Sequence, residues 1–222
     1  DSMTEKGKHQ LDAFIALLES NDREGAVAYA LGLLERGDVT IPELYEEILA
    51  PSLNRIKVPR ETEDELIWRE HLQSAIVQAV MGACWPFLLL QRQKYGMPGR
   101  NTRVLLVAPE EEYHEIGIRM GMDFFVLLGY QVDYIGCNTP RDTMLNAVKT
   151  LKPDLVCISV TNYLNLAQLP AIIAAVKPNE PAPRVFIAGS ALARTGKSAL
   201  DFGADGALTS FESIREIREA KQ

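Results

Sequence analysis

The sequence is poor in the residues that mark several common protein classes. It has three cysteines in 222 residues, Cys84, Cys137 and Cys157, which stand far apart and form no C-x-x-C pair. This number and spacing exclude a disulfide framework and the usual zinc sites. Unpaired cysteines are typical of a reducing compartment, so we expect a cytoplasmic protein.

Basic residues and long apolar runs are also scarce. Lys and Arg number 23 against 30 Asp and Glu, which gives a formal net charge of -7. A nucleic-acid partner requires a basic face, so direct nucleic-acid binding is not expected. No apolar run reaches the ~20 residues of a membrane-spanning helix, and residues 1–4 lack the pattern of a signal peptide. We therefore expect no membrane partner.

The first part of the chain has the periodicity of helices alone. Residues 1–96 are predicted to form an all-α bundle of four to five helices, followed by a linker at Gly96-Met97-Pro98-Gly99. A break is expected over 55–62, which contains Pro59. The expected helices are one around Leu11–Leu18, one over 23–35, one that Thr40 caps at Ile41-Pro42-Glu43, and a long one over 63–94 with a kink at Trp85-Pro86.

Residues 97–222 alternate between short apolar runs and amphipathic segments, which predicts a five-stranded parallel sheet covered by helices on both faces. The flavodoxin-like (Rossmann-like) strand order is expected, with a ligand beyond the carboxyl ends of the strands. The expected strands are 104–108, 132–135, 155–159, 185–188 and 206–208, and the expected helices lie near 115–129, 141–151, 163–177, 191–202 and 211–220.

The residues that follow the strands offer one imidazole, several hydroxyls and small side chains, without a row of basic residues. They are Pro109–Gly117 after the first strand, Ser159–Tyr163 after the third, Gly189-Ser190-Ala191 after the fourth and Thr209-Ser210 after the fifth. The G-x-G-x-x-G motif of a dinucleotide site is absent. Ser159 and Thr209 stand where a receiver domain needs aspartate and lysine, and the acidic first loop does not suit a flavin phosphate.

These observations do not exclude a large neutral ligand that contains a metal and needs one imidazole from the protein. His114 could supply that imidazole, and Glu112 could accept the other ring N–H and so fix the tautomer. The alternative is an ordinary solvated loop histidine at the start of a helix. For Ser159 and Thr161 the alternative is capping of a strand end.

These residues resemble a known family. Glu112-Tyr113-His114-Glu115-Ile116-Gly117, Ser159-Val160-Thr161 and Ala188-Gly189-Ser190 are similar to the D-x-H-x-x-G, S-x-L and G-G motifs of cobalamin-binding domains. Methionine synthase, corrinoid methyl carriers and cobalamin-dependent regulators contain such domains. The resemblance runs from about residue 101 to the end, and the helices before it resemble the cap over the corrin in the same proteins.

The resemblance implies cobalamin (methyl, hydroxo or aquo, or adenosyl form) with its benzimidazole tail off the cobalt and inserted into the sheet domain. His114 would be the lower axial ligand, Ser159 would meet a tail nitrogen, and Thr161 and Ser190 would flank the nucleotide. Gly117, Ser159 and Gly189 would leave room for the tail. The remaining expected cofactor contacts are Glu112, Tyr113, Glu115, Ile116, Val160, Ala191, Thr209 and Ser210.

The helical part carries a second resemblance. Trp68-Arg69-Glu70-His71-Leu72-Gln73-Ser74 is similar to the E-H-x-x-S stretch in the cap of light- or cobalamin-responsive regulators. This implies that Trp68, Glu70 and His71 contact the cofactor's upper side. An interhelical polar contact for His71 and a core position for Trp68 are the alternatives. Arg60 stands where photoreceptors have a tryptophan, which favours small upper ligands over adenosyl.

The sequence departs from the motifs at three positions, where Glu112 replaces aspartate, Thr161 replaces leucine and Ala188 replaces glycine. The glutamate form is more similar to regulators than to methyl carriers. We expect a sensor that acts through a protein partner, and the alternative is a corrinoid carrier between methyltransferases. No substrate-activating group beyond the corrin is visible, so we do not expect catalysis by this chain alone. A homodimer is left open.

Overall fold

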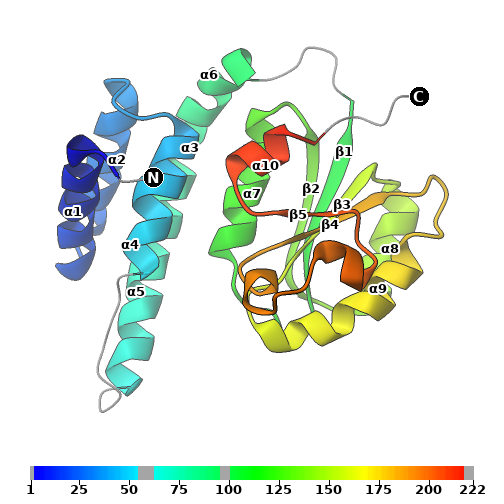
Figure 1. Ribbon diagram of the computed structural model, residues 1–222. Helices are drawn as coiled ribbons and strands as arrows, with labels where there is room; N and C mark the ends of the chain where they lie inside the picture. The colour runs from blue at the N-terminus through cyan, green and yellow to red at the C-terminus, as the bar shows by residue number, and fades with distance from the viewer. Residues whose placement is uncertain (1–2, 55–62, 96–100, 218–222) are drawn as a thin grey trace. The chain divides into compact units, whose positions relative to one another are not determined.

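The computed structural model describes residues 3–54, 63–95 and 101–217. These form two compact units, residues 1–94 and 95–222. The first is helical and the second contains a parallel sheet, and each is described by itself (Figure 1). The expected break over 55–62 and the expected linker over 96–99 lie outside the described residues.

The helical unit begins with α1 (Glu5–Glu19) and α2 (Arg23–Glu35). Thr40 then caps a continuous stretch of α3 (Ile41–Glu43), the π-helix η1 (Leu44–Leu49) and α4 (Ala50–Asn54). The Thr40 hydroxyl accepts from the Glu43 amide and the Glu43 carboxylate accepts from the Thr40 amide, so the predicted cap is confirmed as a capping box. Buried side chains such as Leu11, Phe14 and Tyr45 form the core.

The predicted long helix with a kink is confirmed as α5 (Glu63–Ala83) and α6 (Trp85–Tyr95), which are bent by 56° at Cys84. Pro86 cannot donate a backbone hydrogen bond, which accounts for the break at this point. In the described part of the chain, no single helix is long and apolar enough to cross a membrane. The bent pair passes that test only when its two helices are taken together.

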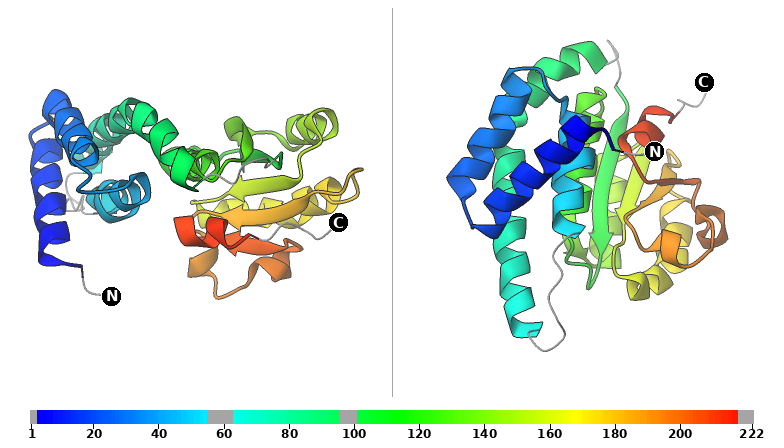
Figure 2. Two further views of the ribbon diagram at one scale, coloured as in Figure 1. Left: turned by 90° about the horizontal axis from the view of Figure 1, so that it is seen from above. Right: turned by 60° about the vertical axis from the view of Figure 1, so that its left-hand side comes forward.

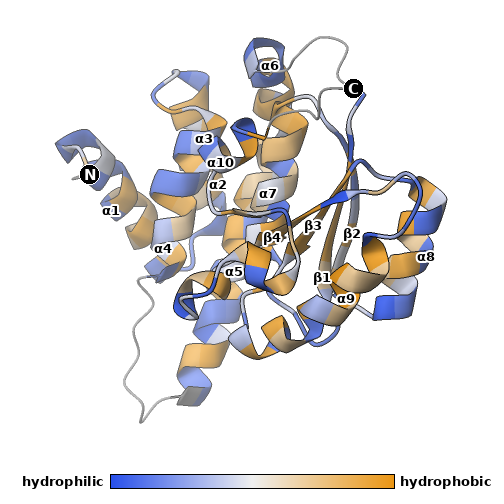
Figure 3. Ribbon diagram, turned by 45° about the vertical axis from the view of Figure 1, so that its right-hand side comes forward, coloured by the Kyte–Doolittle hydropathy of each residue, from blue (hydrophilic) through white to orange (hydrophobic). Residues whose placement is uncertain are grey.

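The second unit is a five-stranded, fully parallel sheet in the order β2-β1-β3-β4-β5, which is the predicted flavodoxin-like (Rossmann-like) arrangement. Its strands are β1 (Arg103–Pro109), β2 (Gln131–Thr139), β3 (Leu155–Ser159), β4 (Arg184–Ala188) and β5 (Gly206–Leu208). The central strands β1 and β3 are almost wholly buried, as expected for a sheet covered on both faces. In Figure 3 these strands carry hydrophobic colours, whereas the helices carry both hydrophobic and hydrophilic colours.

Helices cover both faces of this sheet (Figures 1 and 2). One face carries α7 (Ile116–Leu127) and α10 (Phe211–Arg215), and the other carries α8 (Arg141–Leu151) and α9 (Leu169–Val176). The 3-10 helix η3 (Tyr163–Gln168) runs directly into α9. Because all strands are parallel, the loops after them meet at one edge of the sheet, where the site was expected.

Two sequence predictions about helices are wrong. The segment 191–202 is two short 3-10 helices, η4 (Leu192–Arg194) and η5 (Ala199–Phe202), rather than one helix. Gly196 lies between them at φ +68°, in the left-handed region, and so interrupts the helical course. The last predicted helix is shorter than expected, because α10 ends at Arg215 and residues 218–222 lie outside the described chain.

Candidate functional site

The loop after β1 carries the predicted imidazole. It runs from Glu110 to Glu115 between the end of β1 and the start of α7. Glu111 takes a left-handed conformation at φ +67°, which turns the chain so that Glu112 points inward. The exposed fraction is 1% for Glu112, whereas Tyr113 next to it is 63% exposed. The loop therefore buries one acidic side chain and presents its neighbours outward.

The buried carboxylate of Glu112 binds two groups at once. Its Oε1 accepts hydrogen bonds from the backbone N–H groups of Thr161 (2.5 Å) and Asn162 (2.8 Å), just after β3. Its Oε2 lies 2.8 Å from Nδ1 of His114 and 3.5 Å from the His114 amide nitrogen. One side chain thus joins the loop after β1 to the loop after β3 and fixes the imidazole.

The ring of His114 is held on one side and open on the other. Its side chain is 57% exposed, and among the described residues none hydrogen-bonds to Nε2. With Nδ1 on a carboxylate, Nε2 presents the lone pair that a metal requires. The described residues contain no cluster of three or more His, Cys, Asp or Glu that could hold a metal. The donor set therefore suits a metal that brings its other ligands with it, as cobalt does in a corrin.

Electrostatics keep Glu112 ionised. Burial by itself would raise the pKa of this carboxyl group, but the hydrogen bonds from His114, Thr161 and Asn162 together outweigh burial and lower it below its ordinary value. A carboxylate that stays charged is the form that accepts from a ring N–H. The geometry thus favours the tautomer with the proton on Nδ1.

Asparagine and glutamine side chains, which the sequence reasoning missed, hold the same loop from both sides. From the end of β2, the side-chain oxygen of Asn138 accepts from the Glu111 amide (3.0 Å), and the backbone N–H of Asn138 donates to the Glu112 carbonyl (2.9 Å). From η3, the amide of Asn165 donates to the Glu111 carbonyl (3.3 Å). Gln168 at the end of η3 donates to the Glu110 carbonyl (2.8 Å).

A polar cluster from β2 supports the residue after His114. The hydroxyl of Tyr134 and the Nε of Arg119 each donate to Glu115 Oε1 at 3.2 Å. Burial and the nearby Glu115 carboxylate raise the pKa of Tyr134 to about 12. Cys137 contacts the His114 carbonyl through Sγ (3.4 Å), and burial raises its pKa to about 11. Tyr134 and Cys137 are therefore neutral at physiological pH. The Glu115 carboxylate is hydrogen-bonded to Tyr134 and Arg119 of the protein itself.

Ser159, Thr161 and Gly117 lie where a ligand could meet them. Ser159 ends β3 and is 3% exposed, and no residue in the described ranges hydrogen-bonds to its hydroxyl. Thr161 is half-buried and binds Glu112 through its backbone only. A Cβ placed on Gly117 would meet no atom within 4 Å, so this glycine borders open space. Room for a cofactor tail at these positions stays a prediction.

Gly189 is required by the fold itself. Its φ is +88°, and a Cβ there would lie 2.2 Å from the Val160 carbonyl oxygen. Val160 is fully buried and pairs with its neighbours, since its amide donates to the Ala188 carbonyl and its carbonyl accepts from the Ala191 amide. The close backbone approach explains this glycine without any ligand.

The other predicted contact residues are spread along the same edge of the sheet. Ser190 is exposed and Ala191 is buried, and Ile116 begins α7. Ser210 caps α10 by accepting from the Ser213 amide (3.1 Å), and Thr209 precedes it. Ser210 thus has a structural role as a helix cap, which could not be distinguished from ligand binding in the sequence. Contact of these residues with a cofactor stays a prediction.

The predicted upper-side residues lie on α5 of the helical unit. Trp68 is 47% exposed and Leu72 is 40% exposed, and His71 and Glu70 are exposed beside them. Residues three and four apart share a helix face, so Trp68, His71 and Leu72 form one stripe. The alternative of a core position for Trp68 is wrong, because this side chain is 47% exposed. The His71 side chain is exposed, and within the described ranges it makes no hydrogen bond to another helix.

The fold and the site can be compared with known proteins. The model of the B12 binding domain family matches residues 102–217, more than half of the chain. The chain belongs to the B12-binding domain family. Within this cobalamin-binding domain, the match spans every strand and includes the Glu112–His114 loop, Ser159 and Gly189. The family membership supports cobalamin as the cofactor of this chain.

Two known proteins are similar to this chain, one in sequence and one in fold. The HTH-type transcriptional repressor CarH of Myxococcus xanthus is 31% identical over 115 residues, which are 52% of this chain and 36% of the repressor. The chain thus spans about a third of that relative's length. The monomethylamine corrinoid protein of Methanosarcina barkeri matches 94% of this chain and 96% of its own, with a TM-score of 0.73 and 14% identity. At that identity, the likeness establishes the fold alone.

Proposed function

We propose that this chain binds cobalamin with His114 as the lower axial ligand and the benzimidazole tail displaced from the cobalt, and that it serves as a cobalamin-dependent sensor acting through a protein partner. The observation that carries the binding mode is the buried Glu112 carboxylate, which holds His114 Nδ1 at 2.8 Å and leaves Nε2 open. A free loop histidine has no need of a buried charge beneath it.

The residues of the chain prepare the site before the cofactor arrives. Glu112 fixes the tautomer and direction of the ring, and the Thr161 and Asn162 amides fix Glu112. Because these bonds are already made, binding does not have to pay for ordering the ligand. When bound, cobalamin supplies a cobalt whose upper ligand can be exchanged or can carry a methyl group.

The tail would enter beside Ser159. Its buried hydroxyl, which lacks a bond to the described residues, can donate to a nitrogen of the tail. Gly117 borders open space and supports an entry from the α7 side. Ser190, being exposed on the next strand end, is placed to flank the nucleotide.

Two observations support the role of a sensor. The chain is similar in sequence to a transcriptional repressor, and α5 carries the exposed stripe Trp68, His71 and Leu72. We propose that this stripe meets the upper side of the cofactor, so that a change of upper ligand alters the helical unit and thereby the affinity for a partner. A corrinoid methyl carrier is the second candidate, because the fold of a corrinoid protein matches the chain over 94% of its length.

The binding mode can be tested by spin resonance. The chain is loaded with cobalamin, reduced to Co(II), and compared after growth with ¹⁴N-histidine or ¹⁵N-histidine. A histidine nitrogen on cobalt changes the nitrogen splitting of the signal between the two samples. Splitting that is identical in both, and that matches free base-on cobalamin, would show that the tail keeps its place and His114 is not a ligand.

The tail can be tested separately with cobinamide, a corrinoid that lacks the nucleotide. Ser159→Leu overfills a buried position and should weaken cobalamin binding while leaving cobinamide binding unchanged. Ser159→Ala, which keeps the space but removes the hydroxyl, should have a smaller effect in the same direction. Equal loss of both corrinoids in Ser159→Leu would contradict insertion at this point.

Sensor and carrier differ in their chemistry. Loaded protein is illuminated and offered oxidants, and in parallel reduced to Co(I) and offered a methyl donor with a corrinoid methyltransferase. A lasting ligand change that alters the elution volume or partner binding supports the sensor. Repeated cycling between Co(I) and methyl-Co(III) at the rates of known carriers supports the second candidate.

A further inference from the structure

A pocket lies at the carboxyl edge of the sheet, on the face that α8 and α9 cover. Its volume is about 390 Å³, it is open to solvent, and its three charged residues are exposed. None of the residues predicted to bind cobalamin lines it. Its walls are charged at Glu110, Arg141 and Asp142 and apolar at Pro140, Ala171 and Ile172. Its lining residues follow the carboxyl ends of three strands: Glu110 follows β1, Pro140 to Asp142 follow β2, and Gln168 to Ile172 come after β3.

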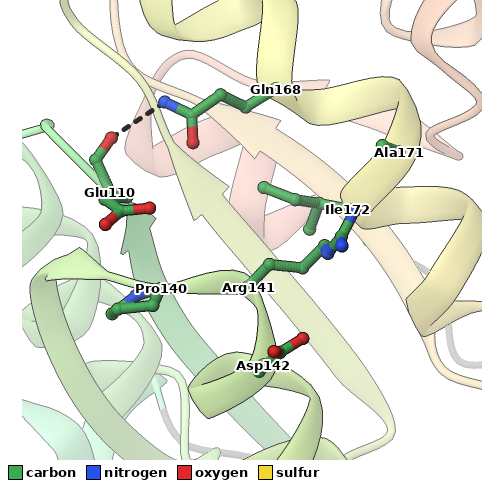
Figure 4. A pocket seen from close by; sticks show the side chains of 7 residues that line it. All are labelled: Glu110, Pro140, Arg141, Asp142, Gln168, Ala171 and Ile172. Carbon is green, nitrogen blue, oxygen red and sulfur yellow. Dashed lines mark hydrogen bonds between the residues drawn. The ribbon is translucent and has the colours of Figure 1, made fainter.

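The charges around the pocket are of both signs and are separated. Figure 4 shows the Glu110 carboxylate on one side and the Arg141 guanidinium on the other, with Ile172 beside the arginine and Asp142 below. Within residues 3–54, 63–95 and 101–217, no ion pair or side-chain hydrogen bond involves any of these three charged groups. Opposite charges that line one pocket without pairing are available to a ligand that carries both.

We propose that this pocket binds a small zwitterion of the amino-acid type. The ligand's carboxylate pairs with Arg141, whose planar guanidinium can donate two parallel hydrogen bonds. Its ammonium group lies against Glu110, and its aliphatic part packs on Ile172 and Ala171. A simple anion or a simple cation would satisfy only one side of the pocket.

The pocket shares a wall with the loop that carries His114. Gln168, a lining residue, donates to the Glu110 carbonyl (2.8 Å) and to Asn165 Oδ1 (3.1 Å), and Asn165 donates to the Glu111 carbonyl. A ligand held by Glu110 therefore acts on a segment two residues before Glu112. This consequence rests on the proposed function, whereas binding of the zwitterion does not.

The experiment is calorimetric titration of the full chain, with and without bound cobalamin, using glycine, L-alanine and L-valine. Acetate and methylammonium serve as probes that carry one charge each. We expect at least one amino acid to bind with a stoichiometry of one per chain. Each single-charge probe should bind at least about tenfold more weakly than that amino acid. Arg141→Gln and Glu110→Gln should each weaken the amino acid by about tenfold, while Lys149→Gln, on the exposed side of α8, should not.

Three results would overturn the proposal: no binding of any of the three amino acids up to ~50 mM, binding that survives both Arg141→Gln and Glu110→Gln, or acetate binding as tightly as the amino acids. Because the cofactor-free chain is titrated as well, loss of cobalamin binding leaves this result readable. Conversely, failure of the titration leaves the histidine test of the cofactor site unaffected.

Discussion

Two histidines, one in each unit, were predicted to face the same metal, and the structure treats them differently. His114 follows β1 and has a buried carboxylate at its Nδ1, with four further hydrogen bonds fixing that loop from the β2 and η3 sides. His71 lies on an exposed face of α5 beside Trp68 and Leu72. The first ring has a hydrogen-bond partner at Nδ1, and the second is exposed on a helix face.

The difference separates two tasks. A permanent ligand gains affinity from being held in place beforehand, because the ordering cost has already been met in folding. A group that must respond to an exchangeable upper ligand needs freedom of movement, and an exposed helix face provides it. We infer that the sheet unit supplies affinity and the helical unit supplies response.

The largest effect that this comparison predicts is on stability. Glu112→Ala removes a buried acceptor and leaves the Thr161 and Asn162 amides without their partner, so the free energy of unfolding should fall by ~2–4 kcal/mol. Glu70→Ala, on the exposed face of α5, should change it by less than ~0.5 kcal/mol. Chemical denaturation of both variants measures the difference. Equal, small effects would mean that Glu112 does not organise the loop.

The next effect is on the cofactor. His114→Ala should keep the fold, shift the visible spectrum of bound cobalamin and weaken its binding by at least the roughly 10- to 100-fold that loss of a residue supporting a metal ligand costs. His71→Ala should leave affinity within about threefold and alter only the upper-ligand spectrum. Both are read from one spectroscopic titration. A spectrum of His114→Ala identical to that of the unmodified protein would remove this residue from the cobalt.

The sequence predicted the bounds of the buried strand β3 better than those of the edge strand β2, for a physical reason. β3 is buried at every residue, so its apolar run and its strand coincide at Leu155–Ser159. β2 lies at the edge of the sheet, is half-exposed and pairs irregularly with β1, so its apolar run stops at Ile135 although the strand continues to Thr139. The position of Asn138 at a strand end was therefore not visible.

The sequence predicted the chemical groups of the site better than the residues that hold them in place. Glu112 and His114 stand two residues apart, and a contact over that distance follows from local sequence. The partners of Glu112 are backbone amides 49 and 50 residues further on, and Asn165 and Gln168 act on backbone carbonyls. Backbone groups have no sequence signature, so only the folded chain reveals which side chains reach them.

A smaller effect concerns pH and tests whether the hold on His114 depends on charge. The pKa of Glu112 in the folded protein lies below its ordinary value of 4.5, so the ionised form stabilises the fold. That stabilisation is complete above the unfolded value and is lost as the pH falls through the lower, folded value. The difference in unfolding free energy between the unmodified chain and Glu112→Gln should therefore be constant above about pH 5.5 and shrink below about pH 4.5. A difference that grows on acidification would contradict an ionised Glu112.

A small effect on stability should come from Trp68, although it is the largest side chain in the upper-side stripe. Since 47% of its surface is already exposed, Trp68→Ala should cost less than ~1 kcal/mol, whereas Ile76→Ala, a buried position on the same helix, should cost ~2–4 kcal/mol. The same Trp68 variant, loaded with cobalamin, should still show His114 on the cobalt but exchange its upper ligand at a different rate. Stopped-flow exchange of water for cyanide measures that rate. If the rate and the stability both stayed unchanged, the exposed face of α5 would have no part in the response, and the division of tasks between the two units would fail.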